Sequence, residues 1–223
     1  MPNRPLSRRD PQNGKNGFSI IKGFTVIELM VVVAIIAIVT SLALPSYRAI
    51  LEKRQVTSGA QQVTAFLSAA KMEAIKRNEK VAISTYVDAN EWCMGFVAYD
   101  ANEPDAGSDC DCTLNDPAAV GACAVDEFGD GTMVLRVLRG SQLNKPVNMT
   151  AIDLGGGDDM VIFDPIRGML VADDTVPMPL EMKLLSKHET YALNIQLTAT
   201  GRVTVCSDMT AADINVPGYD DCG

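Results

Sequence analysis

The longest apolar stretch of the chain covers residues 24–44 and reads FTVIELMVVVAIIAIVTSLAL. Its one charged residue is Glu28. A helix rises ~1.5 Å per residue, so a helix over this stretch would be about 31 Å long, enough to cross the hydrocarbon core of a bilayer. The pattern therefore predicts a transmembrane helix over 24–44.

The next part of the chain predicts that the same helix continues as an amphipathic one. Six small or apolar residues recur at alternating spacings of four and three, which places them on one helical face. These residues are Val56, Ala60, Val63, Leu67, Ala70 and Ala74. Pro45 lacks an N–H and clashes with the preceding turn, so we expect a kink there. We expect one helix over 24–78 that packs its apolar face on a sheet.

Beyond residue 80 the pattern is typical of short strands separated by turns. The turn signals include 88–90, 129–131 and 200–201, and the last of these predicts a hairpin around Gly201. The expected strands are Val81–Val87, Trp92–Tyr99, Thr132–Leu138, Met160–Phe163, Met169–Ala172, Tyr191–Thr198 and Arg202–Cys206. The predicted fold is α+β, with a long N-terminal helix packed on an antiparallel β-sheet domain over 79–223.

Charge divides the chain at the start of the apolar stretch. Residues 1–23 hold five basic residues and one acidic residue, a net charge of +4, which leaves −13 on the other 200 residues of a chain with net charge −9. Basic residues flanking a membrane segment stay cytoplasmic, so we expect the C-terminal part to be translocated. Its acidity disfavours nucleic acid as a partner. The only histidine, His188, excludes sites built from several histidines.

A carboxylate within an apolar helix is costly and usually has a partner. If the chain is cut between Gly23 and Phe24, the new amino group lies about one helical turn from Glu28. The two could pair within one subunit or between staggered subunits, and the second arrangement would fix the register of an assembly. Two alternatives stay open. One is a cleavable secretory signal ending near 41–43, and the other is a plain signal anchor with an incidental Glu28.

The segment Lys22-Gly23-Phe24-Thr25-Val26-Ile27-Glu28-Leu29, followed by a long apolar run, resembles the class III (type IV) prepilin signal. This resemblance implies that a prepilin peptidase cleaves after Gly23 and methylates the new N-terminus at Phe24. It also gives Glu28 the role of an assembly salt bridge. Residues 1–23 would then be a cleaved leader, and the mature protein would cross the inner membrane once, with its C-terminal domain in the periplasm.

Scattered motifs over 69–206 resemble a narrower group, the FimT/FimU/GspH minor pilins and pseudopilins. They are Ala69–Arg77 leading into a strand, Trp92–Phe96, Ile162–Gly168 and Leu193–Cys206. The resemblance implies a non-enzymatic minor pilin at the tip of a type IV pilus, with other pilins as partners and a role in pilus assembly and twitching. A GspH-type pseudopilin of type II secretion is the alternative. A DNA-uptake pilin is disfavoured, since Thr204 stands where DNA-binding members carry a second basic residue after Arg202.

All six cysteines follow the apolar stretch, and an even count on the translocated side favours disulfides. Cys206 with Cys222 is the preferred pair, because it ties the tail to the last strand. Cys93, Cys110, Cys112 and Cys123 would then pair among themselves. A metal site at Cys110-Asp111-Cys112 is the alternative to disulfides, but zinc sites usually have more residues between cysteines.

The remaining candidates for chemistry have simpler interpretations. The acidic stretch 100–116 could hold calcium but lacks a matching ligand pattern, so we expect a solvated loop there. Residues 155–157 lack the Lys and Ser/Thr of a phosphate loop, and 148–150 matches a glycosylation acceptor by pattern alone. We expect His188 at the surface, and no catalytic residue, cofactor or metal.

Overall fold

The structure is a computed structural model that describes residues 23–88, 91–99, 110–127, 129–143, 147–153, 160–171, 180–212 and 214–222. The side chains of 42–46 and 150–153 lie outside this description. The chain divides into two compact units, Met1–Pro45 and Ser46–Gly223. The leader predicted over 1–23 lies outside the described residues, except for Gly23.

Helix α1 covers Val26–Arg77 and is continuous through Pro45. It begins two residues later than expected, because Thr25 serves as its N-cap: the Thr25 hydroxyl accepts the Glu28 N–H at 3.2 Å. It ends where Asn78 adopts a left-handed φ of 55°. There the Glu79 N–H reaches back to the Ala74 carbonyl and the Asn78 N–H to the Ile75 carbonyl, which closes the helix with a Schellman motif. The kink expected at Pro45 stays a prediction.

Among the residues that the structure describes, no helix has both the length and the apolar character needed to cross a bilayer. The span over 24–44 therefore stays a prediction.

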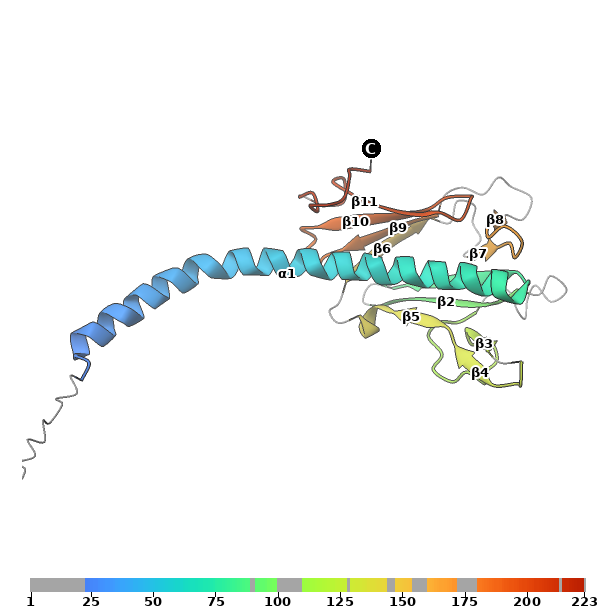
Figure 1. Cartoon of the computed structure of the whole chain (residues 1–223), viewed down its shortest axis with the longest axis horizontal. Helices are drawn as coiled ribbons and strands as arrows, with labels where there is room; N and C mark the ends of the chain where they lie inside the picture. Colours follow the sequence, from blue (N-terminus) through green and yellow to red (C-terminus); the bar gives the residue numbers. More distant parts are fainter. Residues whose placement is uncertain are drawn as a thin grey trace, which may run out of the picture. The chain divides into compact units, whose positions relative to one another are not determined.

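The six residues of the predicted apolar stripe, from Val56 to Ala74, are all 0–1% exposed. They belong to one hydrophobic core with the inner faces of two sheets. Phe66 of α1 also packs on Phe96, with ring centroids 5.3 Å apart. The prediction that this half of the helix packs on a β domain is confirmed, and Figure 1 shows α1 running alongside the sheets.

A five-stranded antiparallel sheet has the order β5-β2-β1-β7-β8. Its strands are β1 (Val81–Val87), β2 (Trp92–Ala98), β5 (Val137–Arg139), β7 (Met160–Phe163) and β8 (Leu170–Val171). Strands β1 and β7 have the predicted bounds. The strand expected over 132–138 is wrong, since it is two strands, β4 (Met133–Leu135) and β5. They separate at Arg136, because β4 pairs with β3 (Ala124–Asp126) while β5 pairs with β2.

A four-stranded antiparallel sheet has the order β11-β10-β9-β6. Its strands are β6 (Asn148–Asp153), β9 (Leu180–Leu185), β10 (Ala192–Leu197) and β11 (Val203–Ser207). Strands β10 and β11 form the expected hairpin, in which Gly201 has a φ of +70°. Strands β3, β6 and β9 were not predicted.

The outer face of the five-stranded sheet is covered by the segment 110–123. The Cys110 N–H donates to the Ser84 hydroxyl of β1 at 2.9 Å. Cys123 lies directly on Gly95 of β2, where an added Cβ would stand 2.0 Å from its sulfur atom. Beyond this segment, a short 3₁₀ helix, η1 (Gly140–Gln142), follows β5. The fold therefore buries the first four residues of β1 and the first five of β2 on both faces, and it leaves the end of β1 exposed.

Candidate functional site

The N-terminal segment brings the residues of the predicted processing signal to the start of α1. Gly23 and Phe24 precede the helix without regular secondary structure, and both are exposed, with Phe24 81% accessible. Glu28 lies in the first helical turn, where a negative charge interacts favourably with the helix dipole. The spacing Thr25-x-x-Glu28 is that of a capping box. An exposed peptide bond before a capped helix is accessible to a peptidase.

The first turns of α1 display large apolar side chains around the whole helix. Their exposed fractions range from 48% at Val32 to 73% at Val26. Among the described residues, Glu28 forms no ion pair. An apolar surface of this kind marks contact with a membrane or with another protein. Cleavage at Gly23, methylation of Phe24 and an ion pair of Glu28 are not tested by this geometry and stay predictions.

All six cysteines form disulfides. Cys206 bonds to Cys222, the pair preferred from the sequence. The other four pair among themselves as Cys93–Cys112 and Cys110–Cys123. These bonds fix the segment 110–123 on the five-stranded sheet. They also remove the thiolates that the alternative metal site at Cys110-Asp111-Cys112 would have needed.

The acidic stretch falls largely outside the described residues, which begin again at Cys110. Asp111 accepts the Thr113 N–H at 2.8 Å and the Thr113 hydroxyl at 2.6 Å. The Thr113 side chain and then its backbone N–H lower the pKa of Asp111. Asp116 likewise accepts the Ala118 N–H at 2.9 Å. Both carboxylates close local turns, and within the described parts of the chain no group of three or more side chains is placed to ligate a metal.

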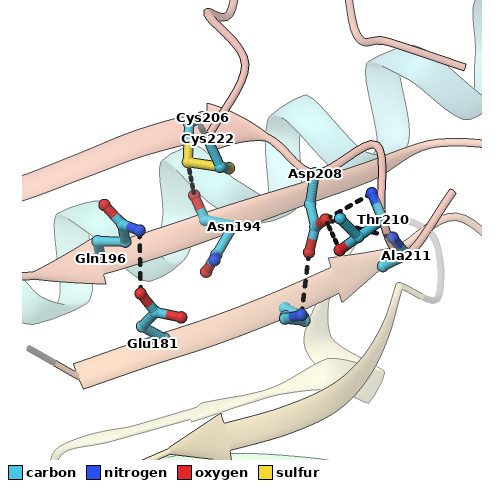
Figure 2. A network of polar contacts seen from close by, with 9 residues as sticks. Glu181, Asn194, Gln196, Cys206, Asp208, Thr210, Ala211 and Cys222 are labelled. Carbon is cyan, nitrogen blue, oxygen red and sulfur yellow. Dashed lines mark hydrogen bonds and ion pairs between the residues drawn. A yellow bond between two sulfur atoms is a disulfide. The ribbon is translucent and has the colours of Figure 1, made fainter.

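The C-terminal tail is fastened to the outer face of the four-stranded sheet by a buried carboxylate that the sequence analysis did not single out. Asp208 accepts the N–H groups of Thr210 at 2.9 Å and Ala211 at 3.2 Å, and it pairs with Lys183 at 3.2 Å (Figure 2). Burial raises the pKa of Asp208, but the hydrogen bonds from Thr210 and Lys183 outweigh it and hold the pKa below its usual value. The spacing Asp208-x-Thr210 is the signal that could have revealed this turn.

A second junction missed by the sequence analysis joins α1 to two turns. The Lys71 ammonium donates to the Gly201 carbonyl at 3.1 Å. Gly201 in turn lies against the Gly168 backbone, since an added Cβ would stand 2.1 Å from the Gly168 oxygen. Both glycines lie in motifs that the sequence shows, but the contact between them depends on the fold. The contact connects the turn after β7 to the hairpin of β10 and β11.

The remaining candidates have structural or surface positions. His188 is exposed, and its Nε2 lies 3.8 Å from Glu52 Oε1. The acceptor pattern at 148–150 lies in β6 and pairs with β9. The glycine run at 155–157 lies outside the described residues.

Two sequence profiles match this chain. Residues 59–201 match the family described as type II transport protein GspH. Residues 18–44 match the prokaryotic N-terminal methylation motif. None of the curated protein sequences is a significant match.

Two solved structures resemble the chain at low sequence identity. The minor pseudopilin EpsH from the type 2 secretion system of Vibrio cholerae is 13% identical, with a TM-score of 0.40 over 69% of this chain and 97% of that chain. The type IV minor pilin FimU of Pseudomonas aeruginosa is 12% identical, with a TM-score of 0.41 over 70% of this chain and 91% of that chain.

Proposed function

The chain belongs to the family of type II transport protein GspH, and we propose that it serves as a minor pilin at the tip of a type IV pilus. The family consists of pilin-like structural subunits, so the chain is a subunit of an assembly and not an enzyme. The observation that carries the proposal is the start of α1. There the N-terminal methylation motif coincides with an exposed apolar helix containing one carboxylate.

In this proposal a prepilin peptidase cuts between Gly23 and Phe24 and methylates the new amine. Before assembly the segment 24–44 holds the subunit in the inner membrane, with residues 79–223 in the periplasm. In the filament the same apolar side chains pack on helices of other pilins. Packing removes these side chains from water, which is favourable. Where the helices meet within lipid, close van der Waals contact between them favours bundling instead.

Glu28 would set the axial position of the subunit in this bundle. A carboxylate packed among apolar helices is unfavourable unless it meets a positive charge. The amino group at Phe24 of this subunit or of a neighbour can supply it. Only some axial offsets bring the two groups together, so the pair favours one register.

Intact mass spectrometry of the purified mature protein tests the processing step. We expect the mass of residues 24–223 with one added methyl group and three disulfides. A mass that starts at Met1, or at a residue after 41–43, would contradict the assignment of Gly23 as the cleavage site.

Incorporation into sheared filaments tests the assembly step. Glu28→Ala should greatly reduce the amount of subunit that co-purifies with filaments, while Glu79→Ala, which removes an exposed carboxylate after the end of α1, should not. Membrane levels of both variants are measured in parallel, because loss from the membrane would point to instability. Equal incorporation of the two variants would refute the role of Glu28.

The second candidate is a minor pseudopilin of type II secretion, and the name of the matching family favours it. Both machines would use the same N-terminal segment, so the discriminating test is cellular. Deletion should abolish twitching and surface pili if the chain is a minor pilin. Loss of secreted proteins with intact twitching would assign it to secretion.

A further inference from the structure

Two hollows meet at the rim of the five-stranded sheet, far along the chain from the N-terminal segment. One has a volume of about 300 Å³ and the other about 450 Å³. Tyr86 and Thr113 line both. Each volume is within the range of small-molecule sites, ~300–1,000 Å³. We propose that the hollows form one binding site for a neutral glycan, with Tyr86 as the aromatic surface on which a sugar ring stacks.

Tyr86 has the position and exposure that stacking requires. It is the sixth residue of β1 and pairs in register with Cys93 of β2. The disulfide-bonded segment 110–123 covers the sheet up to this point, yet 49% of Tyr86 stays exposed. A phenol ring offers an apolar face and a polar hydroxyl, which matches a pyranose with its C–H face and its ring of hydroxyls.

The first hollow also contains polar side chains that the fold does not use. Asn115, Ser141 and Gln142 line it and are exposed. Within the described residues, none of these three side chains makes a hydrogen bond. An amide supplies both donors and acceptors, and a sugar hydroxyl needs both. Unused amides beside an exposed aromatic ring are therefore suited to hydroxyl groups.

The wall of this hollow is held rigid by contacts beneath it. Arg139 donates to the carbonyls of Cys112 at 3.0 Å and Leu114 at 2.6 Å. The Trp92 indole donates to the Val147 carbonyl at 2.7 Å. The Cys93–Cys112 disulfide joins β2 to the covering segment. A site fixed before binding loses little conformational entropy when it takes up a ligand.

Charge in the hollow favours a neutral ligand. Glu91 and Arg139 line the first hollow with opposite signs. Asp111 lines the second hollow, and its carboxylate already accepts two hydrogen bonds from Thr113. Two of the five N–H donors of Arg139 are used by loop carbonyls, so the others remain for a ligand oxygen. An anionic sugar would meet Glu91 and an acidic domain, and a cationic one would meet Arg139. A neutral oligosaccharide meets neither penalty.

Saturation-transfer NMR on the full mature chain tests the site. The protein is held in a detergent without a sugar headgroup, and the probes are cellotriose, maltotriose and N,N′,N″-triacetylchitotriose. We expect transfer to ring protons of at least one probe. Tyr86→Ala should weaken binding roughly tenfold or more, as loss of an aromatic anchor does, and Tyr86→Phe should retain most of it. Trigalacturonate should give the weakest transfer.

Tyr47→Ala is the matched control, because Tyr47 is also an exposed tyrosine and lines neither hollow. Absence of transfer to all three neutral probes overturns the proposal, and so does equal binding by Tyr86→Ala and the parent chain. Equal loss in Tyr47→Ala would also overturn it. The peptide Gly-Asn-Gly is run alongside, and transfer to the peptide alone would assign the hollows to protein contact. The test needs no filament, so its failure leaves the proposed function untouched.

Discussion

Replacing Gly201 by alanine should destabilise the β domain more than the same change at a glycine with free space around it. Gly201 has a φ of +70°, and its missing side chain leaves room for the Gly168 backbone. An added Cβ would stand 2.1 Å from the Gly168 oxygen and 3.0 Å from the Lys71 ammonium. Because the closest atom belongs to backbone, a side-chain rotation cannot relieve the clash.

The loss of stability in Gly201→Ala has two contributions, and a control variant separates them. Holding alanine in the left-handed region costs ~1–2 kcal/mol, and displacing packed backbone adds ~1–3 kcal/mol. Gly129 has nearly the same φ, +71°, with nothing within 4 Å of an added Cβ. Gly129→Ala should therefore show the first cost alone, and Gly201→Ala should show both.

Thermal unfolding of the full chain in detergent measures both variants, with fluorescence of the single tryptophan as the signal. Trp92 is buried in the β domain, so its emission reports that unit. Each kcal/mol should lower Tm by ~2–4 °C in a domain of this size. Gly201→Ala should melt several degrees below Gly129→Ala. Equal Tm values would refute the idea that close approach of the two turns matters.

Three further changes are measured by the same unfolding assay. Leu67→Ala should cost ~2–5 kcal/mol, because Leu67 is fully buried where α1 meets the sheets; a loss below 1 kcal/mol would contradict that packing. Replacing Cys206 and Cys222 together by serine should cost ~3 kcal/mol, since the bond closes a loop of 16 residues, and an unchanged Tm would show that the tail is held by other contacts. Asp208→Asn should destabilise at pH 7. The pKa of Asp208 is lowered on folding from 3.8, so its contribution is complete above that value and is lost as the pH falls through the lower folded pKa. The difference from the parent chain should therefore shrink in acid, and a constant difference would refute the role of its charge.

The helix and its buried face followed from the sequence because both depend on local periodicity. In a two-layer fold the apolar face of an amphipathic helix packs on the sheet, so Val56 to Ala74 could be assigned to the core. The start of α1 was misplaced by two residues, because the apolar run begins before the Thr25 cap. Capping depends on the hydrogen bond made by one side chain, and hydropathy does not report it.

The strands that were missed depend on pairing more than on composition. Strand β9 alternates well, with Leu180, Met182 and Leu184 buried and Glu181 and Lys183 between them. These residue types favour helices. Their helix propensity therefore obscured the alternation of apolar and polar residues that indicates a strand. The segment of β6 has no clear alternation of its own and is a strand because it pairs with β9.

The candidate sites divide in the same way. The processing segment is contiguous, so its motif could be read directly from residues 22–29. The hollow beside Tyr86 gathers residues from β1, β2, the covering segment and η1. Such a site can be recognised only in the folded structure, because no spacing in the sequence predicts it.

The cap on α1 determines what proteolysis would do to the helix itself. Thr25 is the second residue after the proposed scissile bond, so the hydroxyl that caps the N-terminus of the helix stays with the mature chain. Loss of the leader would therefore change the electrostatics of this end without fraying it. A fresh ammonium at Phe24 opposes the positive pole of the helix, by ~0.3–1 kcal/mol. Glu28, one turn further on, offsets that repulsion within the same subunit.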